Sequence, residues 1–586
     1  MHLQPIDWLL IVLYFVASTA IGIYYSRRAG RSTVEFFLSG RSLPWWLAGT
    51  SMVATTFAAD TPLAVTELVT TKGIAGNWLW WNMASGGMLT VFFFARLWRR
   101  SGVLTDVELT ELRYSGKAAS FLRGFRALYL GVFMNCVIMG WVNLALASIL
   151  QGLFGIPAER VLWYVVGCMA LVAVYSAMSG LWGVVVTDVF QFVIAMGGTI
   201  VLAVVVLSLP EVGGITGLQQ KLPASSFQFL PQIGEDGHGA GTALGLTISA
   251  FFAYIAIQWW ASSYPGAEPG GGGYVAQRMM SAKDEKHSLL ATLWFTVAHY
   301  CLRPWPWILT GLVTLVLYPE LGDADKKLGY VYAMRDHLPA GFLGLLVAAF
   351  LAAYMSTINT HLNWGTSYLI NDFYRRFMKS GRSEKHYVLV SRVATIGMMV
   401  VSVIVTANMQ TITGAWAFIL EAGAGLGLVL ILRWYWWRVN AWSEIVAMIA
   451  PFVAIAFIKT QTGIQFPESL FVIVAFTTLC WLGATFLTKP TDEATLVTFY
   501  RRVHPGGLLW RPVANKVPDV QGDSGFGGLF LNWLAGIVLV YTALFGTGKV
   551  IFGDITTGLL LYAIAFAAGW LIYRDLSKRG WSAVTR

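Results

Sequence analysis

Long apolar runs separated by short polar segments dominate the sequence. A transmembrane helix needs about 20 mainly apolar residues, and about fifteen runs meet that criterion. The polar stretches near 210–240 and 489–525 are too short to bury a core of their own. The pattern therefore predicts an all-α integral membrane protein without a separate soluble domain. The expected spans lie near 7–27, 43–71, 76–98, 119–153, 158–179, 181–209, 241–264, 287–318, 339–376, 386–409, 411–437, 441–460, 466–488, 526–548 and 554–574.

Basic residues gather in alternate loops between these runs. Cytoplasmic loops carry an excess of Lys and Arg, so this alternation indicates orientation. It predicts a multi-pass protein of the cell membrane with its N-terminus outside and its C-terminus in the cytoplasm. The basic loops contain Arg27, Arg28, Arg31 and Arg41; Arg96, Arg99, Arg100 and Arg113; Arg278, Lys283 and Lys286; Arg375, Arg376, Lys379, Arg382 and Lys385; Arg433 and Arg438; Arg501, Arg502, Arg511 and Lys516; and Arg574, Lys578, Arg579 and Arg586.

Composition supports a lipid environment. Hydrophobic residues make up 56% of the chain and charged residues 12%, about half the share typical of a soluble domain. The formal net charge of +10 is explained by basic cytoplasmic loops, so we expect no nucleic-acid partner. The four cysteines form no CxxC pair, which argues against zinc or a disulfide framework. No nucleophile–base pair or metal-protease motif is present, and we do not expect an enzyme.

The second apolar run is interrupted between Ala54 and Pro62. Small and hydroxyl residues, the acid Asp60 and a proline occur together at mid-helix. Proline removes a backbone donor and frees carbonyls one turn earlier, and freed carbonyls in a broken membrane helix can coordinate a cation. The alternative is a simple proline kink.

A cluster of oxygen-bearing side chains follows in the long run 339–376. Ser356 and Thr357 are adjacent, and Asn359 and Thr360 lie one turn further on. Hard cations prefer oxygen ligands. The alternative is that these hydroxyls bond back to their own helix.

Three charged residues lie within apolar runs: Asp188, Arg303 and Glu421. An ionisable residue at membrane depth is costly and is a functional candidate by default. A structural ion pair or an interfacial position is the alternative for each, with Asp60 or Glu421 as the expected partner of Arg303. The run Gly270–Gly273 lacks the following Lys-Ser/Thr of a phosphate-binding loop.

Several short motifs occur in a fixed order. They are Gly102, Thr105, Glu108 and Arg113; the stretch Ser179–Gln191; Glu211–Gly214; Gln277–Lys283; Asn371–Tyr374; and Trp437–Asn440. With them, the sequence resembles the sodium:solute symporter family, which includes sodium/glucose, sodium/proline and sodium/sialic acid transporters. The likeness extends over residues 5–450.

The resemblance implies a LeuT-like fold with two inverted five-helix repeats. On that basis we expect an extra N-terminal helix in 1–30, a first repeat in 43–209, a second repeat in 241–438 and about four extra helices in 439–586. Sites in such folds lie at the membrane midplane beside broken helices.

The resemblance also implies a sodium site. Carbonyls of Ala54, Phe57 and Ala353 and the hydroxyls of Ser356 and Thr357 match the positions that bind this ion in the family. Some members have a second site, which would use Asp188, Ser356, Asn359 and Thr360 here; Asn359 replaces the usual hydroxyl. Sodium is the coupling ion, and no other cofactor is expected.

Substrate positions follow from the same resemblance. Arg303 occupies the place of a substrate-binding lysine of the sugar transporters, and Trp80 the place of a sugar-binding glutamate. An arginine can instead hold a carboxylate with two parallel hydrogen bonds. Pro265–Gly273 is an apparent insertion. The full expected substrate set is Thr56, Asp60, Thr61, Trp80, Asn82, Trp259, Trp260, Arg303 and Glu421.

The function implied is sodium-coupled symport of a small polar solute, a sugar, amino acid or carboxylate, into the cell by alternating access. Two alternatives remain. A proton-coupled symporter of the same fold would use acids such as Asp188 and Glu421 as relays. A membrane sensor that has lost transport would keep the fold but not need the ion ligands.

Overall fold

The computed structural model describes residues 3–29, 35, 38–103, 105–175, 181–231 and 246–580. Ser179 and Gly180 of the expected motif, Arg31, Arg586 and the start of the run expected at 241–264 lie outside these residues. The described chain is helical, and its only β-type pairing is an isolated bridge between Leu43 and Ala282. The all-α membrane class predicted from the sequence is confirmed.

Nine helices of the described chain are long and apolar enough to cross a membrane. A tenth candidate is the pair α22 (Ile412–Ala422) and α23 (Leu426–Tyr435), which bends by 48°. The expected count of fifteen is not confirmed, because several expected spans are short or interrupted. The nine are Gly116–Phe154, Leu181–Leu207, Glu285–Leu317, Phe342–Met378, Leu389–Ala407, Ala441–Gln461, Ser469–Leu487, Phe526–Ile551 and Ile555–Arg579.

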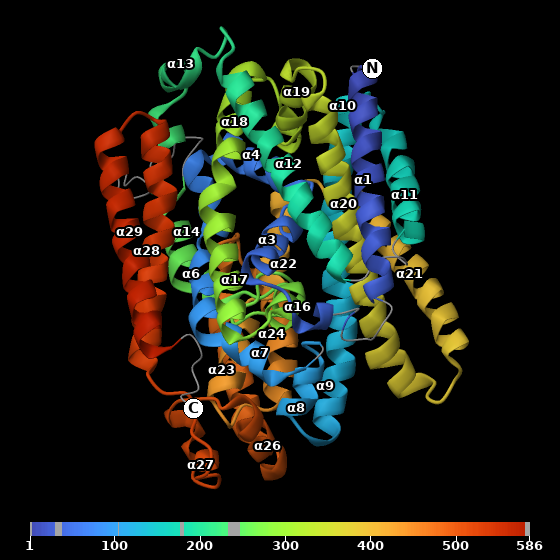
Figure 1. Ribbon diagram of the computed structural model, residues 1–586, viewed down its shortest axis with the longest axis vertical. Coiled ribbons are helices and arrows are strands. Elements are labelled where there is room, and N and C mark those ends of the chain that lie inside the picture. The colour runs from blue at the N-terminus through green and yellow to red at the C-terminus, as the bar shows by residue number, and fades with distance from the viewer. Residues whose placement is uncertain are drawn as a thin grey trace.

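The helices form one bundle (Figure 1). Helices α28 and α29 pair at one side, and α1, α11 and α21 lie at the other. Helix α1 packs against α12 and α20. Their bounds are α1 Pro5–Ala29, α11 Ala158–Tyr175, α12 Leu181–Leu207, α20 Phe342–Ser367, α21 Glu384–Ala407, α24 Ala441–Gln461, α25 Ser469–Leu487, α28 Phe526–Ile551 and α29 Ile555–Arg579.

The second expected span is broken as predicted. Helix α3 (Trp45–Thr55) ends, four residues follow, and α4 (Asp60–Lys72) begins. Pro62 lies in the first turn of α4, where a missing N–H costs little. The carbonyl four residues before it belongs to Ala58, inside the break, and accepts instead from Thr61 N at 3.2 Å. The interruption is therefore a true break and not a kink.

A second interruption lies in the segment that looked like an insertion. Helices α14 (Ile248–Phe252) and α15 (Trp259–Ala261), joined by a π-helical turn, end before α16 (Gly273–Ser281). The backbone between them is non-helical and needs outside partners at membrane depth. Ser263 N donates to Gly423 O at 3.1 Å, and Gly425 N donates to Ala261 O at 2.8 Å. This break and the bend between α22 and α23 thus supply hydrogen-bond partners for each other's backbone groups.

Glycines make these close approaches possible. A Cβ at Gly423 would lie 2.1 Å from Ser263 O. Gly271 has a positive φ of 80°, and a Cβ there would lie 2.6 Å from Met279 Cε. The glycine-rich run therefore lets a non-helical chain turn inside the packed bundle.

The remaining helices complete the bundle and its two ends. Helix α1 begins at the end where α13 (Gly214–Lys221) and α19 (Leu328–His337) lie, and α29 ends at the opposite end near α26 and α27 (Figure 1). The others are α5 Trp78–Trp81, α6 Ala84–Leu89, α7 Ala95–Ser101, α8 Glu108–Arg113, α9 Gly116–Leu128, α10 Asn135–Phe154, α17 Glu285–Val297, α18 Pro304–Leu317, α26 Glu493–Val503 and α27 Arg511–Ala514.

The first prediction concerns orientation. We expect the end with α13 and α19 to face outside and the end with α26 and α27 to face the cytoplasm, because the basic loops favour the second. Asp323→Cys and Asp519→Cys are both exposed sites, one at each end. With the four native cysteines replaced by alanine, an impermeant thiol reagent added to intact cells should label the first and not the second. Labelling of both, or of Asp519→Cys alone, contradicts the orientation.

Candidate functional site

A cavity of about 150 Å³ lies where the two interruptions face each other. Its walls come from the break between α3 and α4, from the segment 264–275, from α5, α6, α10, α15, α17, α20 and α22, and from the turn that ends at Arg303 before α18. The lining residues are Thr55, Thr56, Ala58, Asp60, Thr61, Trp80, Met83, Gly86, Gly87, Thr90, Ile138, Trp141, Val142, Trp259, Tyr264, Pro265, Gly266, Ala267, Glu268, Pro269, Gly271, Tyr274, Val275, Thr292, Phe295, Thr296, His299, Tyr300, Arg303, Thr357, Thr360, His361 and Trp416.

The cavity brings together much of the expected site. Thr56, Asp60, Thr61, Trp80, Trp259 and Arg303 of the substrate set line it, together with Thr357 and Thr360 from the hydroxyl helix. These residues come from five separate stretches of the chain. Their convergence on one space is what a binding site requires.

Arg303 is fully buried at the junction of a π-helical turn and α18. Pro304 and Pro306 occupy the first turn of α18, which suits proline. The Nη1 group donates to Val53 O at 3.0 Å and to Thr56 Oγ1 at 2.8 Å. The guanidinium also lies 5.2 Å from the ring centre of Trp307. Arg303 thus holds the end of α3, while its Nε and Nη2 have no hydrogen-bond partner.

Asp60 is the first residue of α4 and is 3% exposed. The N-terminus of a helix favours a negative charge. Its Oδ1 has no hydrogen-bond partner. Trp416 and Trp141 hydrogen-bond the Asp60 side chain. Asp60 lines the same cavity as Arg303, but no ion pair within 4.0 Å joins these two described residues. Asp60 and Arg303 are therefore buried groups of opposite charge in one cavity that do not contact each other.

Aromatic rings cover the wall beside Arg303. Trp80 stacks on Tyr300 with ring centres 5.7 Å apart and meets the His299 ring edge-on at 5.6 Å. Trp80 Nε1 donates to Asn77 Oδ1 at 2.9 Å. His299 Nδ1 lies 3.1 Å from Thr56 Oγ1. Trp80 therefore offers the cavity an apolar surface.

The expected sodium ligands lie on facing elements. The ring of Phe57, in the break, contacts the ring of Phe350 on α20 at 6.4 Å, one turn before Ala353. Thr357 Oγ1 donates to Ala353 O at 2.8 Å, so the hydroxyl's lone pairs stay free. Ser356 is partly exposed. Ala54 O accepts from Phe57 N at 2.9 Å.

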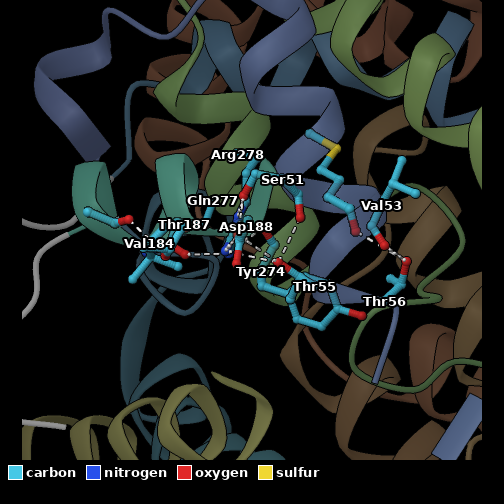
Figure 2. Close-up of polar contacts among 12 residues, drawn as sticks. Ser51, Val53, Thr55, Thr56, Val184, Thr187, Asp188, Tyr274, Gln277 and Arg278 are labelled. Carbon is cyan, nitrogen blue, oxygen red and sulfur yellow. Dashed lines mark hydrogen bonds and ion pairs between the residues drawn. The ribbon is translucent and has the colours of Figure 1, made fainter. Parts of the chain in front are cut away.

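Asp188 lies in a separate buried network (Figure 2). Ser51 Oγ donates to Asp188 Oδ2 at 2.6 Å, and Thr55 Oγ1 at 3.4 Å. Arg278 Nη2 lies 3.8 Å from the same oxygen and donates to Thr55 Oγ1 at 3.2 Å. The network joins α3, α12 and α16, and the sequence had not identified Arg278 as the partner of Asp188.

Three expected substrate residues do not line the cavity. Asn82 Nδ2 donates to Trp78 O at 2.7 Å and Leu79 O at 3.0 Å, within its own helical segment. Trp260 Nε1 donates to Ala256 O at 2.7 Å. Glu421 accepts from Ser469 Oγ at the start of α25. Glu421 is therefore not the partner of Arg303.

Several lining residues were missed by the sequence reasoning. Tyr264, Glu268 and Tyr274 belong to the glycine-rich second interruption, and Trp141 and Trp416 come from α10 and α22. Glu268 Oε2 accepts from Gly266 N at 2.9 Å. An acid between glycines and prolines in an apolar region was a readable signal for this segment. The two tryptophans lie in ordinary apolar helices and gave none.

The fold and cavity define a helical membrane protein of the transporter class, with broken helices around a central cavity. The model of the sodium:solute symporter family matches residues 36–451. The chain belongs to the sodium:solute symporter family.

Sequence relatives agree with this membership. The sodium/glucose cotransporter of Vibrio parahaemolyticus is 23% identical over 520 residues, which cover 84% of this chain and 92% of the relative. The sodium/mannose cotransporter of Bos taurus is 24% identical over 482 residues, covering 75% and 76%. The sodium/glucose cotransporter 4 of Mus musculus is 24% identical over 449 residues, covering 69% of this chain and 60% of the relative.

Among solved structures, a Na+-coupled sialic acid symporter in a substrate-bound outward-open state has a TM-score of 0.62 to this chain at 19% identity. The match covers 83% of this chain and 99% of that one. It confirms the expected LeuT-like fold.

The second prediction concerns the Asp188–Arg278 network. Removing one partner leaves a buried charge uncompensated, which costs about 3 kcal/mol or more. Asp188→Asn and Arg278→Gln should each lower the apparent melting temperature of the purified protein, and the double variant should recover part of the loss. The exposed pair Arg501–Asp519 provides matched controls, Arg501→Gln and Asp519→Asn, which should change little. If the buried-site variants and the control variants lower the melting temperature equally, the pairing of Asp188 with Arg278 is contradicted.

Proposed function

We propose that this protein is a sodium-coupled symporter that carries a small polar organic solute into the cell by alternating access. The observation that carries the proposal is the single cavity lined at once by the broken helix, by Arg303 and by the hydroxyl helix α20. Family membership supports sodium as the coupling ion. A sugar, an amino acid and a carboxylate are the solute classes considered.

The main sodium site is proposed at Ala54, Phe57, Ala353, Ser356 and Thr357. Three carbonyls and two hydroxyls form a set of hard oxygen ligands, as this kind of cation prefers. The non-helical backbone after α3 and the proximity of Phe57 to α20 support the placement. A broken helix beside a continuous one is the arrangement in which unwound carbonyls coordinate ions.

A second sodium at Asp188, Asn359 and Thr360 is also proposed, with a condition. The guanidinium of Arg278 lies 3.8 Å from the Asp188 carboxylate. A sodium ion there would be repelled by that charge. The second site therefore requires Arg278 to move away, which links it to a conformational change of α16.

The solute is proposed to contact Arg303, with Thr56, Asp60, Thr61, Trp80 and Trp259 around it. A fully buried arginine that leaves part of its guanidinium without a partner is expensive unless something completes it. Asn82, Trp260 and Glu421 do not line the cavity and bond elsewhere, so the proposal gives them no contact with the solute.

The third prediction tests the sodium site. Ser356→Ala with Thr357→Ala removes two of five proposed ligands, so half-maximal uptake should need several-fold more sodium. The matched control is Ser391→Ala with Thr395→Ala on α21, where both hydroxyls donate to their own helix. Sodium-dependent uptake into proteoliposomes measures the effect. An unchanged sodium response of the first variant contradicts the assignment, and uptake driven by a proton gradient alone favours proton coupling.

The fourth prediction tests Arg303. Arg303→Gln should leave the protein folded, keep its stabilisation by sodium and lose its stabilisation by solute. Arg501→Gln, on the surface, is the control. Thermal unfolding with sodium alone and with sodium plus solute separates the two effects. Poor folding of Arg303→Gln that is not rescued by Arg303→Lys would show a purely structural role, and retention of both stabilisations would show neither role.

A further inference from the structure

We propose that the solute is a zwitterion: a small organic molecule with a carboxylate that Arg303 binds and a cationic nitrogen that Asp60 binds. The inference rests on the transport function proposed above and specifies the solute for the same cavity. It departs from the sugars named for the sequence relatives.

The free edge of Arg303 is suited to a carboxylate. Its Nη1 is occupied by Val53 O and Thr56 Oγ1, whereas Nε and Nη2 have no partner. The hydrogens of Nε and Nη2 point from the same edge of the planar guanidinium. Two parallel donors on one edge match the two oxygens of a carboxylate. The contacts with α3 fix the orientation of this edge, so binding requires little further ordering.

Asp60 provides the complementary charge. It is 3% exposed, lines the same cavity and leaves Oδ1 without a hydrogen-bond partner. A buried carboxylate with an unused oxygen is costly unless a cation or donor reaches it. Arg303 does not form that contact. A ligand with opposite charges at its two ends would complete both residues at once.

The rest of the wall favours a compact charged solute over a polyol. Threonine hydroxyls of the lining, such as Thr90, Thr292 and Thr357, already donate to carbonyls of their own helices. Trp80 lines the cavity with its ring, and its Nε1 already donates to Asn77 Oδ1. Aromatic faces attract a cationic nitrogen, but they offer a sugar hydroxyl little. The charged side chains of the lining are Arg303, Asp60 and Glu268, and Glu268 Oε2 already accepts from Gly266 N at 2.9 Å. The unused edge of Arg303 and the unused oxygen of Asp60 are therefore the charged groups left for a solute.

The test uses matched probes on the purified full-length protein. L-alanine, L-proline and glycine betaine carry both charges. L-alaninamide and choline lack the carboxylate, N-acetyl-L-alanine lacks the cation, and D-glucose lacks both. The melting temperature of the protein is measured at increasing concentrations of each probe, once in sodium chloride and once in potassium chloride. At least one zwitterion should bind in a sodium-dependent manner, at least about tenfold tighter than its single-charge analogues and D-glucose.

Two variants assign the charges. Arg303→Gln should remove the preference for carboxylate over amide, and Asp60→Asn should remove the preference for the free amine over the acetylated one. Arg501→Gln and Asp519→Asn, the exposed pair, are charge-matched controls and should keep both preferences. The comparison of probes on the unmodified protein stands even if a variant fails to fold.

The outcomes separate the inference from the function beneath it. Sodium stabilisation together with a preference for a zwitterion supports both. Sodium stabilisation with D-glucose or a single-charge probe binding as tightly, or with no zwitterion binding, overturns the zwitterion and leaves sodium-coupled transport standing. Absence of any sodium effect overturns the proposed function itself.

Discussion

The need to satisfy backbone groups inside the bundle governs this structure. Away from water, a helix can break only where other groups take over its free carbonyls and amides. Arg303 does this for α3 by donating from Nη1 to the backbone carbonyl of Val53, and the same Nη1 also donates to the side chain of Thr56. Since the same guanidinium keeps its other edge free, the contact that stabilises the break also positions a cation in the cavity.

The second interruption obeys the same constraint by another route. Ser263 and Ala261 exchange backbone hydrogen bonds with the glycine-containing bend between α22 and α23. Two non-helical segments thus support each other, and the one that begins after Ala261 lines the cavity from Tyr264 to Gly271. The hydroxyl-bearing α20 is continuous through its turn at Ala353–Thr357. In the proposed sodium site, the continuous helix supplies Ala353, Ser356 and Thr357, and the broken one supplies the carbonyls of Ala54 and Phe57.

The sequence predicted the features that depend on local chemistry. Proline, an acid and small residues between Ala54 and Pro62 indicated a break, and the structure has one between Thr55 and Asp60. A lone arginine in an apolar run indicated that Arg303 is a functional candidate or needs a partner of opposite charge. Features that depend on distant packing were not predictable: the partner of Asp188, the separation of Glu421 from the cavity, and the contribution of Trp141 and Trp416. The glycine-rich segment was recognised, but its role as a second break was not.

The central claim is that a sodium gradient drives solute through this cavity. Its most direct test is uptake of a labelled solute, identified by thermal shift, into proteoliposomes holding the purified protein. The account predicts accumulation above the outside concentration under an inward sodium gradient, and its collapse when a sodium ionophore is added. Equal accumulation without sodium, or none above equilibration with it, would contradict the account.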